Sequence, residues 1–185
     1  MRMVKDYREP DGTQARSLEP KGSSLEQLQD DYFLINVDGA IPIGYGHSGI
    51  GILIRDKDLK FIAAMCKPLS GRLGVEETEA IAMEQGLVLA KELGLERVLI
   101  VGDSLQTIQA IEKEEVRGAV GHIVAGIVQE MRSFADVKVK HIGRTDNKIA
   151  HELVQQAKRV KDAMCWLGRE PDIIADLLRH EGELL

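Results

Sequence analysis

The segment RVLIVG, residues 97–102, has an apolar centre with no polar interruption. Short runs of this composition are typical of strands that are buried on both faces of a sheet. The segment stands between a long helical pattern at residues 75–93, which Gly94 ends, and a second helical pattern at residues 104–113. A buried strand with helices before and after it indicates an α/β domain.

Three strand patterns precede the first helix and predict a run of short strands. They lie at residues 32–38, 48–56 and 59–65. Three charged residues at 56–58 separate the last two patterns, which predicts a tight hairpin turn and antiparallel pairing. Further elements are expected as a helix at 120–133, a strand at 136–142 and a helix at 146–161. The order βββ-α-β-α-α-β-α indicates a mixed sheet, antiparallel at the hairpin and parallel beyond it.

The 185 residues suffice for one domain with a substantial core and two tails. Residues 1–30 mix both charges with Gly, Pro and Ser, and we expect them to form a disordered arm. Residues 31–160 contain the strand and helix patterns and are predicted to form the domain itself. Residues 161–185 are predicted to form a C-terminal helical extension.

Several whole-chain properties bear on where the protein acts. The apolar runs are far shorter than a membrane span, and the N-terminal residues carry no signal-peptide core. The two cysteines, Cys66 and Cys165, match no metal-binding spacing and suit free thiols in a reducing compartment. We therefore expect a soluble intracellular protein of the cytoplasm or nucleus, with an organelle as a further option, and no membrane partner. The net charge of −6 disfavours a nucleic-acid partner unless a bound divalent metal supplies positive charge locally.

Two acidic residues stand at the ends of apolar strands. The segment FLINVDGA, residues 33–40, reaches Asp38 and turns at Gly39, and Asp103 directly follows RVLIVG. In open α/β sheets, ligands bind beyond the carboxyl ends of the strands. Interpretations without chemistry are also open. Asp is common in turns, and Asp103 is a preferred helix N-cap, which Gln106 would complete as a capping box.

A third acid lies at the start of the packing face of the first helix. That face consists of Ala82, Met83, Gly86, Leu87 and Ala90. Glu79 precedes it by one turn, and a carboxylate buried there is costly unless something pairs with it. The sequence is equally consistent with a frayed first turn that lets Glu79 reach solvent. If the strands that end in Asp38 and Asp103 are parallel neighbours, three carboxylates converge and require a cation. Ligands that are all oxygen select Mg²⁺ or Mn²⁺.

Three stretches of the chain, in their order and spacing, resemble the ribonuclease H type 1 family. They are NVDGA, ETEAIAMEQGLVLAKELGLERVLIVGDSLQTIQAI and VKVKHIGRTDNKIAHELVQQA. The likeness covers residues 32–159 and is greatest to the compact subgroup common in plants and in retroelement-derived domains. The C-terminal stretch CWLGREPDIIADLL is similar to the ending of that subgroup.

The resemblance implies a ribonuclease H-like fold, an α/β fold with a five-stranded mixed sheet in the order 3-2-1-4-5, flanked by helices. It also implies metal-dependent hydrolysis of the RNA strand of RNA/DNA hybrids, with two Mg²⁺ or Mn²⁺ ions as cofactors. Asp38, Glu79 and Asp103 match the catalytic metal ligands of the family, and Asp38 would bridge the two ions.

The fourth metal-binding position departs from the choice of many relatives. Four residues after Asn147 the chain has His151 in place of Asp, and Asp146 is better placed as a helix N-cap. The resemblance assigns His151 to the second ion as a catalytic metal ligand, with activity that is low in Mg²⁺ and higher in Mn²⁺. Spacing alone favours a half-buried residue at the border of the packing stripe that contains Ala150 and Leu153.

The resemblance implies substrate contacts at Gly39, His141, Arg144 and Asn147. His141 has the spacing of a mobile histidine that aids product release in larger members of the family, and Arg144 fits a phosphate contact. Without the resemblance, His141 is a structural residue at a strand end and Arg144 is an ordinary loop arginine.

Other substrate-binding positions differ from the family, which leaves further functions open. Many relatives carry asparagines that read the minor groove where this chain has Val75 and Glu76, and some carry a glutamine where it has Leu105. One alternative is therefore a domesticated nucleic-acid-binding or regulatory module with little or no turnover. Another is a structural domain that meets a protein partner through residues 1–30 and a helix at 171–181.

Overall fold

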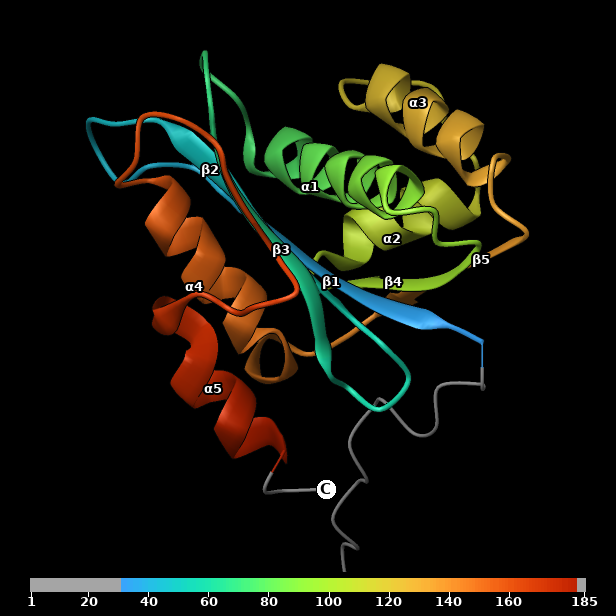
Figure 1. Ribbon diagram of the computed structural model, residues 1–185. Helices are drawn as coiled ribbons and strands as arrows, with labels where there is room; N and C mark the ends of the chain where they lie inside the picture. The colour runs from blue at the N-terminus through green and yellow to red at the C-terminus, as the bar shows by residue number, and fades with distance from the viewer. Residues whose placement is uncertain (1–30, 183–185) are drawn as a thin grey trace, which may run out of the picture.

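The computed structural model describes residues 31–182, so the predicted N-terminal arm and its protein partner lie outside the described residues. The elements run in the order β1 (Phe33–Ala40), β2 (Ser48–Arg55), β3 (Phe61–Leu69), α1 (Val75–Glu92), β4 (Arg97–Gly102), α2 (Leu105–Glu112), α3 (Gly121–Met131), β5 (Asp136–His141), η1 (Arg144–Asp146), α4 (Lys148–Ala157), β6 (Met164–Leu167) and α5 (Asp172–Gly182) (Figure 1). No helix within this part of the chain is long and apolar enough to cross a membrane.

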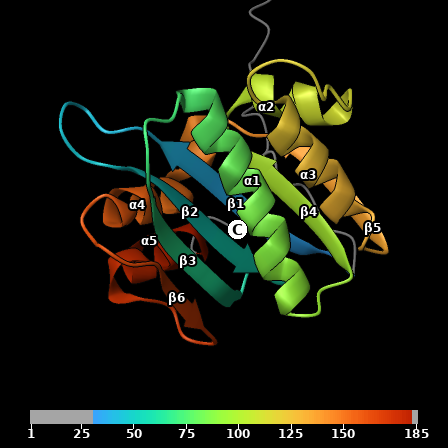
Figure 2. The same cartoon turned by 90° about the horizontal axis from the view of Figure 1, so that it is seen from above.

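The sheet is covered by helices on both faces. Helices α1, α2 and α3 lie on one face, and α4 and α5 lie on the other (Figure 1). Figure 2 shows α1 lying across the sheet with α3 beside it. All five residues predicted for the packing face of α1 are buried, which confirms that prediction. Gly86 allows the closest approach, because a Cβ there would lie only 2.9 Å from Cγ1 of Val37.

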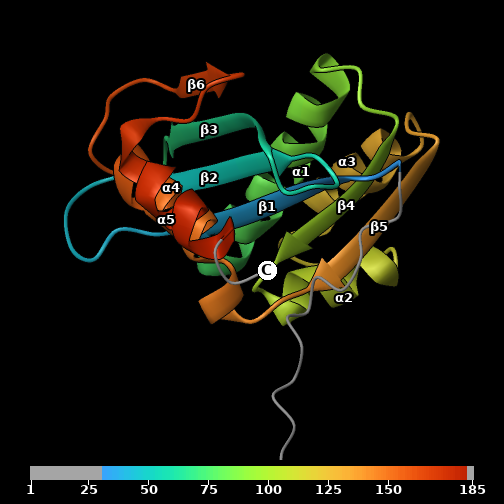
Figure 3. The same ribbon diagram turned by 60° about the horizontal axis from the view of Figure 1, so that its bottom comes forward.

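The strands form one mixed sheet in the order β5-β4-β1-β2-β3-β6 (Figure 3). The pairs β1–β4 and β4–β5 are parallel, and the other pairs are antiparallel. The predicted order 3-2-1-4-5 and the ribonuclease H-like fold are therefore confirmed. The predicted number of five strands is one too few, because β6 pairs with the outer edge of β3 and satisfies backbone groups that an edge strand leaves unpaired.

The C-terminal segment is more than the expected helix. Besides α5 it contains β6, and Ile174 of α5 is fully buried in the core that α4 forms with the sheet. The two cysteines also come close here, on the neighbouring strands β3 and β6. Cys66 pairs with Met164 and Met65 pairs with Cys165, so the two thiols face opposite sides of the sheet and both are free.

Two glycines of β2 let α4 pack directly against the backbone of the sheet. A Cβ on Gly51 would lie 2.3 Å from the carbonyl oxygen of Ala150, and a Cβ on Gly49 would lie 2.7 Å from Cβ of Ala157. No larger residue fits at either position without moving α4. The close packing brings the first turn of α4 next to β1.

Two of the differences from the expected element boundaries change the local structure. The helix predicted at 146–161 is a 3₁₀ turn followed by α4, and its N-cap is Asn147, so the prediction of an Asp146 cap is wrong. The expected tight turn at 56–58 is a wider loop, in which the Asp56 carboxylate accepts hydrogen bonds from the backbone N–H groups of Asp58 and Lys60, both at 2.9 Å. Strand β3 therefore begins at Phe61 instead of residue 59.

Candidate metal centre

Three carboxylates from different elements meet at one end of the sheet. Asp38 is in β1, Asp103 directly follows β4, and Glu79 is in the second turn of α1. Each offers one oxygen to a group in which all the oxygens lie within 4.8 Å of one another. The parallel pairing of β1 with β4 is what places Asp38 beside Asp103, as the sequence argument required. The structure thus brings together the three acids predicted as metal ligands.

Glu79 points inward because α1 begins in direct contact with β1. A Cβ on Gly39 would lie 2.6 Å from the carbonyl oxygen of Thr78, so only glycine permits this approach. The first turn of α1 is also well capped, since the backbone N–H of Gly74 donates to the Glu77 carboxylate at 2.7 Å. Glu79 is only 8% exposed, and the alternative of a frayed first turn is wrong.

Asp103 is left available to the cluster because its neighbour caps the following helix. The hydroxyl of Ser104 accepts the backbone N–H of Thr107, and α2 begins at Leu105. The alternative in which Asp103 caps the helix together with Gln106 is therefore wrong. The Asp103 carboxylate is half-buried and close enough to raise the pKa of both other acids.

Burial and repulsion between neighbouring acids raise the pKa of two of the carboxylates, Asp38 and Glu79. Burial raises the pKa of Glu79 to about 8, with further contributions from the charges of Asp38 and Asp103 and an opposing hydrogen bond from the Gly39 backbone. Burial also raises the pKa of Asp38, although the hydrogen bond from His151 opposes this shift. Buried carboxylates that are held inward against such costs form the all-oxygen donor set that suits Mg²⁺ or Mn²⁺.

His151 lies beside the cluster and is hydrogen-bonded to it. Its Nδ1 is 2.8 Å from Oδ2 of Asp38, and its Nε2 is 3.1 Å from the side-chain nitrogen of Gln155. The Gln155 amide donates to Nε2, so the Nδ1 proton of a neutral ring donates to Asp38. His151 is thus a partner of Asp38 and does not belong to the group of three ligand atoms. Gln155 was not anticipated, although its spacing of four residues from His151 on a helix points to such a contact.

The four residues predicted to contact substrate divide into two buried and two exposed positions. Asn147 is 2% exposed and its amide is used inside the protein, donating to the carbonyl oxygen of Val37 at 2.8 Å. Gly39 is buried under α1. Both residues thus make close contacts inside the protein, and their contact with substrate stays a prediction.

The other two residues border the cluster at the surface. His141 at the end of β5 is exposed, and its Nε2 is 3.2 Å from the backbone carbonyl of Asp103. Arg144 is exposed, and its charge lowers the pKa of both Asp38 and Glu79, which shows that the guanidinium lies near the acids. Both side chains are therefore exposed beside the cluster, and their contact with substrate stays a prediction.

Comparisons with known proteins agree with a ribonuclease H-like fold, which is the fold of the solved structures that superpose on this chain. The chain belongs to the reverse transcriptase-like family, whose model matches residues 36–157. No curated protein matches the chain.

Solved structures share the fold at low sequence identity. Ribonuclease H1 of the archaeon Halobacterium salinarum superposes with a TM-score of 0.62 at 19% identity, covering 68% of this chain and 96% of that one. Ribonuclease H1 LC11 from compost, in complex with an RNA/DNA hybrid, gives a TM-score of 0.61 at 21% identity, with coverage of 69% and 96%. The foamy viral protease-reverse transcriptase in complex with RNA/DNA hybrid superposes with a TM-score of 0.57 at 17% identity, covering 84% of this chain and 23% of that one.

Proposed function

We propose that this protein is a metal-dependent endonuclease that hydrolyses the RNA strand of RNA/DNA hybrids. The observation that carries the proposal is the convergence of Asp38, Glu79 and Asp103 within 4.8 Å at the end of the sheet. Structures with the same fold that are complexed with RNA/DNA hybrids support the substrate class. The family of the chain supports the reaction class.

The roles of the residues follow from their positions. Asp38, Glu79 and Asp103 would hold two Mg²⁺ or Mn²⁺ ions. Ions bound there would supply an activated water and charge stabilisation for phosphodiester hydrolysis. Glu79 gives up its proton when it becomes a ligand, because its raised pKa of about 8 leaves it protonated at neutral pH.

The residues around the acids would orient them and the substrate. His151 fixes the Asp38 carboxylate through its 2.8 Å hydrogen bond, at the place where the family likeness puts a ligand of the second ion. Arg144 and His141, both exposed, would contact phosphates of the hybrid. The 2′-hydroxyl and the A-like shape of the hybrid would distinguish it from duplex DNA.

A cleavage assay on a labelled RNA/DNA hybrid tests the proposal directly. We expect cleavage of the RNA strand in Mg²⁺ or Mn²⁺, no cleavage in a chelator, and none by Asp38→Asn in either metal. Duplex DNA and single-stranded RNA serve as substrates that should remain intact. Wild-type protein that binds the metal but leaves the hybrid intact, or an Asp38→Asn variant that cleaves as fast as wild type, would overturn the proposal.

A binding or regulatory module is the second candidate, and the surface beside the acids favours it. Val75 and Leu105 are 53% and 51% exposed, at positions where the family resemblance implies polar, substrate-reading residues. The chain also has a net charge of −6, which weakens any phosphate contacts. Hybrid binding of equal strength in wild type and Asp38→Asn, with no cleavage in Mg²⁺ or Mn²⁺, would favour this module over the nuclease.

A further inference from the structure

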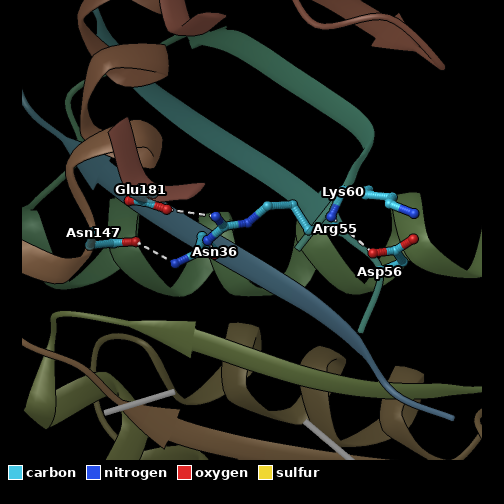
Figure 4. Close-up of polar contacts among 6 residues, drawn as sticks. All are labelled: Asn36, Arg55, Asp56, Lys60, Asn147 and Glu181. Carbon is cyan, nitrogen blue, oxygen red and sulfur yellow. Dashed lines mark hydrogen bonds and ion pairs between the residues drawn. The ribbon is translucent and has the colours of Figure 1, made fainter. Parts of the chain in front are cut away.

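A buried arginine, Arg55, ends strand β2 on the face that α4 covers. The residue is 2% exposed and lies between apolar side chains. A buried guanidinium is costly unless its charge and its donors find partners. One terminal nitrogen of Arg55 donates to the Glu181 carboxylate at 2.6 Å, and the other donates to Oδ1 of Asn36 at 3.0 Å (Figure 4).

The hydrogen bonds continue from Asn36 towards the carboxylate cluster. The Asn36 amide nitrogen donates to Oδ1 of Asn147 at 3.2 Å (Figure 4), and the Asn147 amide nitrogen donates to the carbonyl oxygen of Val37 at 2.8 Å. Val37 directly precedes Asp38 in β1. The backbone carbonyl of Asn147 accepts the N–H of His151 at 3.1 Å. The chain of contacts therefore ends at Val37, the neighbour of Asp38 in β1, and at the backbone of His151.

The groups at the two ends of this chain require the same direction for its side-chain hydrogen bonds. A guanidinium has donors and no acceptor, so the oxygen of the Asn36 side chain must face it. The nitrogen of Asn36 then faces Asn147, whose oxygen accepts and whose nitrogen is turned towards Val37. The Val37 carbonyl at the other end can only accept, which requires the same orientation of Asn147. A side chain without donors at position 55 would leave the buried oxygen of Asn36 without its donor and weaken the polar network.

We propose that Arg55 is a positioning residue for the carboxylate cluster, with Glu181 of the C-terminal helix as its counter-charge. Through Asn36 and Asn147 it fixes the first turn of α4 on β1 and so aligns His151 with Asp38. The consequence for catalysis rests on the proposed function, whereas the consequence for α4 does not.

Glu181 gives the C-terminal helix a part in the site. It lies outside the residues 36–157 that match the family model, and α5 brings it to β2 from 126 positions along the chain. Within the described residues, the remaining nitrogen of Arg55, Nε, has no hydrogen-bond partner. Glu181 is therefore the charged partner on which the buried guanidinium depends, and Asn36 is a neutral one.

The test compares four variants of the full chain. Glu181→Gln leaves the arginine without its counter-charge, and Arg55→Met removes the charge and the donors. The pair Arg55→Met with Glu181→Leu replaces the ion pair by apolar residues, which often restores stability. Ile127→Ala, in α3 on the opposite face of the sheet, is the control for destabilisation alone. The measurements are Tm without metal, hydrogen exchange of residues 148–154 well below Tm, Mn²⁺ affinity by calorimetry and hybrid cleavage.

We expect both single variants to lower Tm and the double variant to recover most of the loss. Exchange of residues 148–154 should remain faster than in wild type even in the double variant, because the buried oxygen of Asn36 has lost its donor and the network that holds Asn147 is weaker. Mn²⁺ affinity should fall by roughly threefold to tenfold. This loss is at or below the lower end of the loss that follows when a direct hydrogen-bond partner of a metal ligand is removed. Ile127→Ala should lower Tm without either change.

Two outcomes would overturn the positioning role. One is a double variant with recovered Tm and wild-type exchange and Mn²⁺ affinity. The other is an Ile127→Ala variant that loses as much Tm as Arg55→Met and changes the exchange of residues 148–154 and the Mn²⁺ affinity by the same amounts. If the wild type neither binds Mn²⁺ nor cleaves the hybrid, the proposed function fails, and the exchange of residues 148–154 still decides whether Arg55 positions α4.

Discussion

The two faces of strand β1 are equally buried but chemically opposite. Ile35 and Val37 face α1 and are fully buried among apolar side chains. Asn36 and Asp38 face α4, are 2% and 4% exposed, and hold hydrogen bonds to Asn147 and His151. Apolar burial on the first face stabilises the fold without fixing the orientation of any polar group, whereas the hydrogen bonds on the second face fix the orientations of the side chains that they join. Substitutions on the two faces should therefore separate stability from metal binding.

The largest effect on stability is expected from the apolar face. Ile35→Ala removes a fully buried side chain and should lower the free energy of unfolding by about 2–5 kcal/mol. The Mn²⁺ affinity of the folded variant should stay at the wild-type value, because Ile35 lies on the opposite face of β1 from Asp38. Denaturant unfolding gives the first quantity and calorimetry at low temperature gives the second. A weaker Mn²⁺ affinity in fully folded Ile35→Ala would show that the two faces are not independent.

On the polar face, Asp38→Asn should abolish the stabilisation that metal binding confers. Ligand at one hundred times its dissociation constant raises the free energy of unfolding by about 2.7 kcal/mol, and the variant should gain none of this. Without metal the variant should be as stable as wild type or more so, because burial and the charge of Asp103 both disfavour the Asp38 carboxylate. Tm with and without Mn²⁺ measures both effects. An equal rise of Tm in both proteins would place the metal elsewhere.

The sequence predicted the apolar face of β1 and the three acids because both leave a local signal. Alternating or continuous apolar runs mark strands, and acids at strand ends and on a helix packing face stand out against them. The ion pair of Arg55 with Glu181 leaves no such signal, since its members are 126 positions apart. Asn36 is visible in the sequence as a polar residue within an apolar strand. Its partner Asn147 is not, because the packing of α4 on the sheet brings the two together.

Two errors of the sequence interpretation have local causes. Asp103 and Ser104 are both good N-caps, and the backbone direction after β4 gives the cap to Ser104. The four residues of β6 are too few to show a strand period, and they become a strand because the edge of β3 is available to pair with them.

A pH dependence should come from Glu79. Its pKa is about 8 in the folded protein and 4.5 ordinarily, so between these values the folded protein holds a proton that the unfolded chain releases. The stability that this proton contributes is fully present below pH 4.5 and is lost as the pH rises to about 8. The metal-free protein should lose up to about 1.4 kcal/mol per pH unit in this window from Glu79 alone.

The variant Glu79→Gln isolates this contribution. Its amide does not titrate. The free energy of unfolding of wild type, relative to that of Glu79→Gln, should therefore fall as the pH rises, by the slope given above. Denaturant unfolding in a chelator at intervals from pH 5 to 8 measures the slope. Parallel curves for the two proteins would mean that Glu79 is not shielded from solvent.

A gain of function is expected from His151→Asp. The change adds a fourth carboxylate next to Asp38, so the metal-free variant should have a lower Tm because of repulsion. Mg²⁺ affinity and Mg²⁺-dependent cleavage should rise by roughly tenfold, the scale on which changes next to a metal ligand act. His151→Asn is the matched control without the charge. A folded His151→Asp variant with no gain in Mg²⁺ would show that the substrate-binding surface limits the rate.

The smallest effect is expected from Arg144, at the exposed border of the polar face. Arg144→Ala should reduce the salt dependence of hybrid binding by about one unit of slope, the effect of one phosphate contact. Tm should change little, since surface substitutions usually fall within about 0.5 kcal/mol. Arg132→Ala, an equally exposed change at the C-terminal end of α3, is the control. Equal slopes for wild type and Arg144→Ala would remove Arg144 from the nucleic-acid surface. A change in Arg132→Ala as large as in Arg144→Ala would mean that overall charge matters more than the position beside Asp38.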